Sequence, residues 1–162
     1  DLIELATTPV TVVAAGAKAI LDLPKTLEVL ETHGVPVIAY GQDDFPAFWS
    51  RGSGLGAPLR MGSAEDIARA AETRAAMGLS GGQLVANPIP QEYEIAQEVI
   101  GPIIEAALDE AEAQGIKGKA VTPFLLDHIF RATDGASLTA NIALVLNNAR
   151  LGAGIARALA GK

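Results

Sequence analysis

The sequence predicts an α/β fold in which helices pack on a partly parallel β-sheet. Three short apolar runs, rich in β-branched and small side chains, have the length and composition of buried strands. These runs are residues 10–15, 35–40 and 83–87. Helix signals stand between them, with Pro24 and Gly34 bounding one helix and a Ser63 cap beginning another. Strands that alternate with helices favour parallel pairing beneath covering helices.

The residues that follow the third strand predict helices. A long helix is expected over residues 92–114, with a kink near Pro102. Thr122 and Ser137 are expected to cap two further helices. Five apolar residues of the last helix fall mostly on one stripe, which is typical of a face packed on a core. They are Ile142, Val145, Leu146, Ala149 and Ile155.

Composition bounds the class of protein. The 162 residues, 49% of them hydrophobic, suffice for one domain over residues 1–162. A net charge of -7 gives no electrostatic basis for binding a nucleic acid polymer or an anionic membrane, and no apolar run approaches the roughly 18–20 residues of a membrane span. Cysteine is absent, which fits a cytoplasmic protein. Because the first residue is Asp1, we expect the chain to begin partway through a longer gene product.

Three polar side chains stand where predicted strands end. Lys18, Tyr40 and Asn87 are expected near one edge of the sheet, because ligands of parallel sheets bind outside the carboxyl ends of the strands. Small and apolar residues flank Lys18. Desolvation lowers the pKa of a lysine, and only the neutral amine attacks a carbonyl carbon. The residues alone leave open a lysine whose stem packs while its ammonium group reaches water.

Other residues admit two interpretations each. Asn141 is placed to point its amide towards a polar ligand, or to hydrogen-bond locally near a helix start. Asp1 is either a metal ligand or a solvated terminus. His33 and His128 form no ligand pair, so a histidine-based metal site is not expected. The glycines of residues 52–56 lack the lysine and hydroxyl residue of a P-loop.

Six segments run in order along nearly all of the chain. They are VTVVAAGAK at 10–18, GVPVI at 34–38, PAF at 46–48, LVANPIP at 84–90, GKAVTPFLL at 118–126 and NIALVLNNA at 141–149. Together these segments resemble the pseudouridine-5'-phosphate glycosidase family, also known as the indigoidine synthase A family. A series of matches in order is more specific than any one of the motifs.

The resemblance implies roles for three residues. The lysine of the Ala-Gly-Ala-Lys segment forms a Schiff base in the family, and it maps to Lys18. The asparagine that opens the segment at 141–149 helps to bind substrate and maps to Asn141. An aspartate upstream of the first strand belongs to a manganese (Mn2+) site and maps to Asp1. Two departures, Ala14 for a common cysteine and Ala19 for a common serine, leave the covalent chemistry unaffected.

The resemblance also implies a reaction and an assembly. Pseudouridine 5'-phosphate and water give uracil and ribose 5-phosphate, reversibly, through cleavage of a carbon–carbon glycosidic bond. The family's catalytic unit is about twice as long as this chain and usually a homotrimer. A glutamate and a second lysine of the site belong to an N-terminal half, so this chain alone is expected to be an incomplete catalyst and part of a larger α/β fold.

Two alternatives remain beside the glycosidase. One is another Schiff-base enzyme that acts on a phosphorylated sugar, such as an aldolase-like lyase. The other is a noncatalytic nucleotide-binding or assembly module that keeps the fold. Trapping of a sugar on Lys18 separates the enzymes from the module, and release of uracil separates the glycosidase from the lyase.

Overall fold

Four parallel strands form the sheet, as the sequence predicts in part. The computed structural model describes residues 1–17 and 21–161. The strands are β1 (Thr11–Ala14), β2 (Val37–Tyr40), β3 (Leu59–Met61) and β4 (Gln83–Ala86), in the order β1-β4-β2-β3. All three pairings are parallel, with Val12 opposite Leu84 and Val85 opposite Ile38. The short edge strand β3 was not predicted, because it lies at the end of a glycine- and proline-rich loop.

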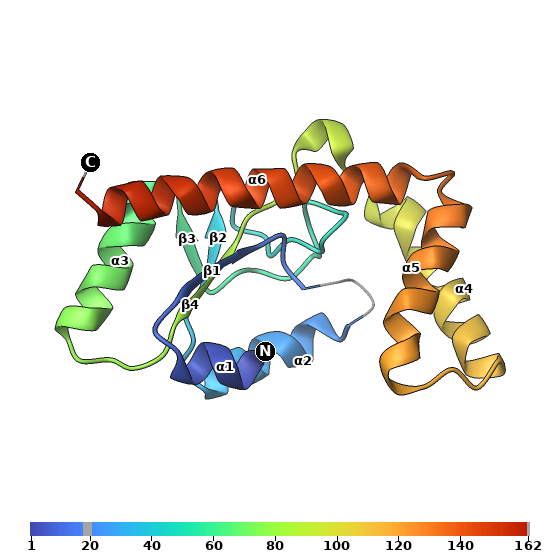
Figure 1. The fold of residues 1–162 in the computed structure, drawn as a ribbon, viewed down its shortest axis with the longest axis horizontal. Helices are drawn as coiled ribbons and strands as arrows, with labels where there is room; N and C mark the ends of the chain where they lie inside the picture. Colours follow the sequence, from blue (N-terminus) through green and yellow to red (C-terminus); the bar gives the residue numbers. More distant parts are fainter. Residues whose placement is uncertain (18–20, 162) are drawn as a thin grey trace.

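Helices cover both faces of the sheet (Figure 1). Helices α1 (Leu2–Thr7) and α2 (Leu23–Thr32) lie on one face, where Leu5 and Leu30 pack with Val12, Leu84 and other apolar residues. Helices α3 (Ala64–Ala76) and α6 (Ala136–Leu159) lie on the other, where their side chains pack with Val13 and Val85. Successive side chains of a strand point to opposite faces, so each strand feeds both layers.

A helical unit stands beside the sheet and shares α6 with it (Figure 1). It consists of α4 (Gln97–Ala113) and α5 (Val121–Ala132), each preceded by a 3₁₀ turn, Gln91–Tyr93 and Gly118–Ala120. The long helix expected from residue 92 thus begins five residues later and contains Pro102. A second core joins this unit to the amino half of α6. Its buried members include Trp49, Ile89, Ile104, Leu125, Ile129 and Leu144.

Two predicted helix caps are wrong. Helix α5 begins at Val121, directly after a 3₁₀ turn, so Thr122 is inside the helix. Helix α6 begins after Gly135, whose φ of 81° is left-handed. Ser137 is buried in the first turn, where its amide donates to the Thr133 hydroxyl at 3.1 Å. Thr133 therefore satisfies the free amide, a role that the sequence assigned to Ser137.

The predicted core stripe of α6 is largely an exposed stripe. Ile142, Val145 and Leu146 are 55%, 54% and 51% exposed. The buried residues of the helix are Ser137, Ala140, Leu144, Leu151 and Ile155. A helix that is apolar on most of its circumference does not reveal from sequence which side faces the core. In the part of the chain that the structure describes, no helix combines the length and the apolar character needed to cross a membrane.

A tight contact joins the end of β1 to the loop at 41–58. Gly16 forms an antiparallel bridge with Ala47, and the Phe48 amide donates to the Ala15 carbonyl at 2.9 Å. Gly16 has a φ of 86°, and a Cβ atom added there would lie 1.7 Å from the Pro46 carbonyl oxygen. Both the backbone conformation and the space therefore demand glycine.

We expect Gly16→Ala to lower the free energy of unfolding by more than about 2 kcal/mol, from the left-handed φ and from the displaced Pro46 carbonyl. Gly34→Ala is the matched control, because Gly34 has a φ of 67° with no heavy atom within 4 Å of an added Cβ. It should cost only about 1 kcal/mol. Urea unfolding followed by circular dichroism measures both, and equal losses would contradict the steric account.

The N-cap residue of α3 lowers the pKa of a neighbouring carboxylate, that of Asp66. The Ser63 hydroxyl accepts from the Asp66 amide at 3.1 Å and donates to its carboxylate at 2.7 Å. This hydrogen bond, with a smaller contribution from the Arg69 guanidinium, holds the pKa of Asp66 below its ordinary value of 3.8. Because the pKa is lowered on folding, the associated stability is present above the unfolded pKa and is lost as the pH falls through the folded one.

Ser63→Ala should therefore raise the pKa of Asp66 towards its ordinary value, because the hydroxyl is the largest single cause of the lowering, and Arg69→Gln should raise it too. Carboxyl chemical shifts followed by NMR during an acid titration measure both changes. An unchanged Asp66 pKa in Ser63→Ala would contradict the assignment.

Candidate active site

The carboxyl ends of the strands meet at one edge of the sheet, as expected for an α/β fold. β1 ends at Ala14, β4 at Ala86 and β2 at Tyr40, and these three strands are neighbours. Asn87 follows β4 directly. Its backbone N–H donates to the Ala14 carbonyl at 2.7 Å, which continues the β1–β4 ladder by one residue. Tyr40 and Asn87 therefore lie at a common edge, as predicted.

The loop at 41–58 lies against this edge and is held there by hydrogen bonds to other segments of the chain. The Trp49 indole donates to the Ser137 carbonyl at 3.1 Å, which anchors the loop to the start of α6. The Ser50 hydroxyl donates to the Ile95 carbonyl at 2.7 Å. Phe48 has a φ of 65°, a conformation that is costly for a bulky residue and is held here by its backbone and aromatic contacts. The loop is therefore a rigid part of the edge.

An arginine joins the loop to the segment after β4. The Arg51 guanidinium donates to the Ile89 carbonyl at 2.7 Å, and the Arg51 amide donates to the Glu94 carboxylate at 2.7 Å. The Gln42 side chain completes the group, donating to the Arg51 carbonyl at 2.6 Å. The chain at 87–90 is thereby fixed from one side by the loop.

Two asparagines of α6 fix the same segment from the other side. Asn87 is 3% exposed, and its amide nitrogen donates to the Asn148 oxygen at 3.0 Å. The Asn147 amide donates to the Pro88 carbonyl at 3.1 Å. Sequence reasoning missed both α6 residues, although the adjacent asparagines in an apolar helix were a visible signal of buried polar contacts.

Asn141 lies on the same helix face, one helical turn from Ser137 and two turns from Asn148. It is half-buried, and within residues 1–17 and 21–161 no hydrogen-bond partner of its side chain is recorded. Its neighbours on that face hold the loop through Trp49 and the β4 extension through Asn87. Asn141 therefore lies on α6 between the residue that meets the loop and the residue that meets the end of β4.

The other two predicted site residues are Lys18 and Asp1. Lys18 lies outside the described residues, and the described chain reaches Ala17 at this edge, directly after the Gly16–Ala47 bridge. Asp1 is the exposed N-cap residue that precedes α1, and its side chain makes no capping hydrogen bond to the helix. Among the described residues, no group of three or more histidine, cysteine, aspartate or glutamate side chains is placed to hold a metal ion.

Comparison with known proteins assigns the family. The model of the family described as "Indigoidine synthase A like protein" matches residues 1–158. The chain belongs to the indigoidine synthase A-like family. This confirms the resemblance noted in the six sequence segments, and the fold of the family fits the parallel sheet with helices on both faces.

Members of the indigoidine synthase A-like family share much of this sequence. A protein of Jannaschia sp. named pseudouridine-5'-phosphate glycosidase is 70% identical over 159 residues, which cover 98% of this chain and 53% of the relative. A protein of the same name from Paracoccus denitrificans is 71% identical over 160 residues, 99% of this chain and 53% of the relative. The chain thus spans about half the length of these relatives.

A solved structure extends the comparison to the fold. The crystal structure of a prealnumycin C-glycosynthase in complex with ribulose 5-phosphate matches with a TM-score of 0.91 at 35% identity. The match covers 99% of this chain and 53% of that chain. The backbone of about half of that glycosynthase is therefore reproduced across nearly all of this chain.

The contact between Asn87 and Asn148 should be measurable as a coupling. In a double-mutant cycle with alanine at both positions, we expect an interaction free energy of about 0.5–1.5 kcal/mol, because either single change leaves a buried amide group without its partner. The control pair is Asn87 with Gln114, an exposed residue at the end of α4. Urea unfolding should find that pair additive within about 0.5 kcal/mol.

Proposed function

We propose that this chain carries the Schiff-base half of a pseudouridine-5'-phosphate glycosidase, which converts pseudouridine 5'-phosphate and water to uracil and ribose 5-phosphate. The observation that carries the proposal is the 70–71% identity, across 98–99% of the chain, to two relatives of that name. The sugar phosphate in the structure of the prealnumycin C-glycosynthase supports the substrate class.

The bond to be broken explains why an amine is needed. Ordinary glycosidases protonate the oxygen of the leaving group with a carboxylic acid. The bond between ribose and uracil in pseudouridine joins two carbons, so no such oxygen is present in the leaving group. An amine bonded to the first sugar carbon offers its lone pair instead, because that pair can form a C=N bond as the carbon–carbon bond breaks.

The proposed sequence of bonds is balanced without a redox partner. The Lys18 nitrogen bonds the first carbon of the sugar while the ring C–O bond opens and its oxygen takes a proton. The bond to uracil then breaks, its electron pair goes to the uracil carbon, which takes a proton, and the nitrogen forms an iminium. Water adds to the iminium, and release of the amine gives ribose 5-phosphate. Proton transfers of this kind need an acid–base group.

The described residues suit a positioning role around that chemistry. The half-buried Asn141 amide offers donors and an acceptor to sugar hydroxyls or to the base. Asn87 is already engaged with Asn148, so it fixes the edge and leaves Asn141 for the ligand. The loop at 41–58, held by Trp49 and Arg51, supplies a wall that keeps this arrangement in place.

We propose a manganese site to which this chain contributes only part of the ligands. Asp1 would be one ligand, as the family resemblance implies. Among the residues that the structure describes, no group of three or more histidine, cysteine, aspartate or glutamate side chains is placed to hold a metal ion. The further ligands would come from the rest of the polypeptide. None of the proposed steps depends on the metal ion.

The assembly belongs to the same proposal. The relatives are about twice the length of this chain. We propose that the portion they have in addition, assigned by resemblance to an N-terminal half, supplies the acid–base group and a second lysine. A homotrimer in the cytoplasm is the expected form of the whole enzyme. Water is consumed in the cleavage direction and released in the synthetic direction, so classification as a hydrolase or as a lyase depends on which direction is taken as the reaction.

Trapping tests the role of Lys18. The chain, supplied with the additional portion of the Jannaschia relative, is treated with ribose 5-phosphate and borohydride, and the modified peptide is mapped by mass spectrometry. We expect one adduct on Lys18, and Lys18→Arg should abolish both the adduct and release of uracil from pseudouridine 5'-phosphate. Lys25→Arg is the matched control, since Lys25 lies in the exposed first turn of α2.

Each outcome selects one hypothesis. An adduct with release of uracil supports the glycosidase. An adduct without uracil release indicates a different sugar-phosphate lyase or a C-glycosynthase that works in the bond-forming direction. Absence of any adduct in the presence of the additional portion rejects Schiff-base chemistry and leaves a noncatalytic nucleotide-binding or assembly module.

A further inference from the structure

One residue of the loop at 41–58 combines a bulky side chain with a left-handed backbone. Among the described residues, Phe48 and Asp134 are the non-glycine residues with a positive φ, at 65° and 48°. Aspartate tolerates this conformation because its short polar side chain bonds locally. For phenylalanine it is strained, and such strain gathers at functional sites. A glycine at position 48 would carry no strain, so the contribution of the aromatic ring has to outweigh it.

Packing in the core accounts for only part of that contribution. The loop contains three aromatic residues, Phe45, Phe48 and Trp49. Phe45 and Trp49 are 0% and 2% exposed, and each belongs to a hydrophobic core, whereas Phe48 is only half-buried. The Phe48 ring meets the Trp49 ring edge to face, with the ring centroids 4.9 Å apart and the planes at 89°. This contact fixes the orientation of the Phe48 ring and leaves part of its surface open.

Phe48 lies at the edge of the sheet where the candidate site is placed. Its backbone N–H donates to the carbonyl of Ala15, which stands three positions before Lys18 in the sequence. The hydrophobic core against which Phe48 packs includes Ala140, the residue before Asn141 on α6. The ring therefore belongs to the same edge as the segment that leads to Lys18 and the part of α6 that carries Asn141.

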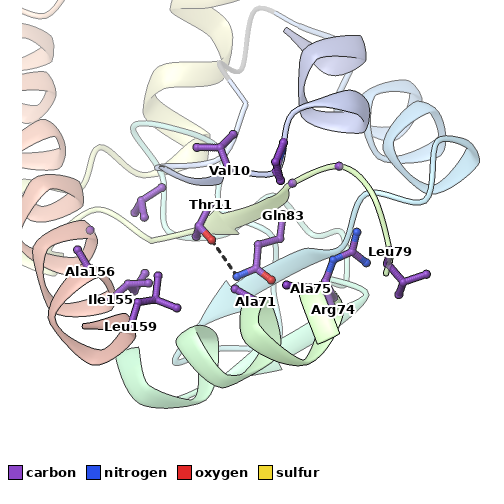
Figure 2. Close-up of a pocket in the computed structure, with 15 residues that line it drawn as sticks. Val10, Thr11, Ala71, Arg74, Ala75, Leu79, Gln83, Ile155, Ala156 and Leu159 are labelled. Carbon is purple, nitrogen blue, oxygen red and sulfur yellow. Dashed lines mark hydrogen bonds between the residues drawn. The ribbon is translucent and has the colours of Figure 1, made fainter. Parts of the chain in front are cut away.

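A second apolar surface lies at the opposite end of the sheet. It is a groove of about 340 Å3 at the amino ends of β1 and β4, bounded by α3 and the carboxyl half of α6 (Figure 2). Val10, Leu79 and Leu159 line it. The strands β1 and β4 are four residues long, about 13 Å, and they separate this groove from the carboxyl edge. A planar ligand that reacts at the carboxyl edge therefore meets Phe48 and not the groove.

We propose that the open part of the Phe48 ring packs against the uracil base and holds it in line with the sugar carbon to which it is bonded. This inference rests on the proposed function. Uracil is planar and uncharged, so an aromatic side chain can hold it through its ring surface. The sugar phosphate is polar and charged, and an apolar ring offers it no hydrogen bond. Phe48 thus selects the base, while Lys18 bonds the sugar.

Kinetics in the bond-forming direction separate the base from the sugar. The chain is joined to the additional portion of the Jannaschia relative, and formation of pseudouridine 5'-phosphate is followed against uracil concentration at saturating ribose 5-phosphate. We expect Phe48→Leu to raise the KM for uracil about tenfold, the effect of a lost contact between a base and an aromatic ring. Trapping of ribose 5-phosphate on Lys18 with borohydride should be unchanged.

Phe124→Leu is the matched control. Phe124 is also a partly buried phenylalanine that packs against the same hydrophobic core, but it lies on α5, where its ring is near His128. The substitution removes the same group from the same core, and it should leave the KM for uracil as it is. An equal rise in both variants would show that loosened packing is responsible, and would overturn the proposal.

A glycine and alanine pair tests whether the strained backbone or the ring serves the reaction. Phe48→Gly and Phe48→Ala both remove the ring, but only alanine keeps the cost of the left-handed φ. We expect the glycine variant to unfold at a higher urea concentration than the alanine variant, and both variants to show the raised KM for uracil. A glycine variant with the KM of the unchanged protein would assign the role to the backbone and would contradict a contact between ring and base.

Direct binding separates this inference from the proposed function. Ring-labelled phenylalanine is followed by NMR in the joined protein, first with ribose 5-phosphate alone and then with uracil added. The Phe48 signal is assigned by its loss in Phe48→Leu. We expect uracil to shift this signal and to leave that of Phe124 in place.

The outcomes differ for the two proposals. A shift of the Phe48 signal by uracil without any turnover would reject the glycosidase and keep the contact with the base. A Phe48 signal that ignores uracil would overturn the contact, whether or not turnover occurs. A changed pH profile of trapping on Lys18 in Phe48→Leu, with an unchanged KM for uracil, would show that the ring acts on the amine and would equally overturn it.

Discussion

The contact between Gly16 and the Pro46 carbonyl is the constraint on which the candidate site depends. It fixes the path of the chain as it leaves β1 and seats the loop at 41–58 against the carboxyl edge of the sheet. The loop then reaches α6 through Trp49, and α6 reaches the end of β4 through Asn148. A side chain at position 16 would push the loop away from the end of β1. The contacts that the loop makes with α6, and that α6 makes with the end of β4, would be displaced in turn.

The site edge is closed by polar contacts made to backbone carbonyls and amides. The carbonyls of Ile89, Ile95 and Ser137 each accept from a loop side chain, and the Pro88 carbonyl accepts from α6. Buried carbonyls that lie outside regular structure need such partners. The half-buried Asn141 lies on the same helix face, and its proposed role is to meet the ligand.

Sequence signals predicted those parts of the fold that are determined by residues close together in the chain. The three strands, of which β1 is half-buried, the Ser63 cap and the position of Asn87 at a strand end all follow from short apolar runs and cap chemistry. The errors arose where distant residues decide. Whether Ile142 or Leu144 faces the core depends on which elements α6 meets, and the cap of α6 depends on Thr133 and Gly135 rather than on Ser137. The asparagine contacts of 147 and 148 join residues about 60 positions apart, so no local pattern contains them.

Helix α6 extends over 24 residues, a rod of about 36 Å that passes from the helical unit to the far end of the sheet. Asn141 is carried near one end of this rod, and Ile155 and Leu159 line the groove near the other. A continuous helix moves as one body. The helix therefore links the groove at one end of the sheet mechanically to the Trp49 contact of the loop at the other end.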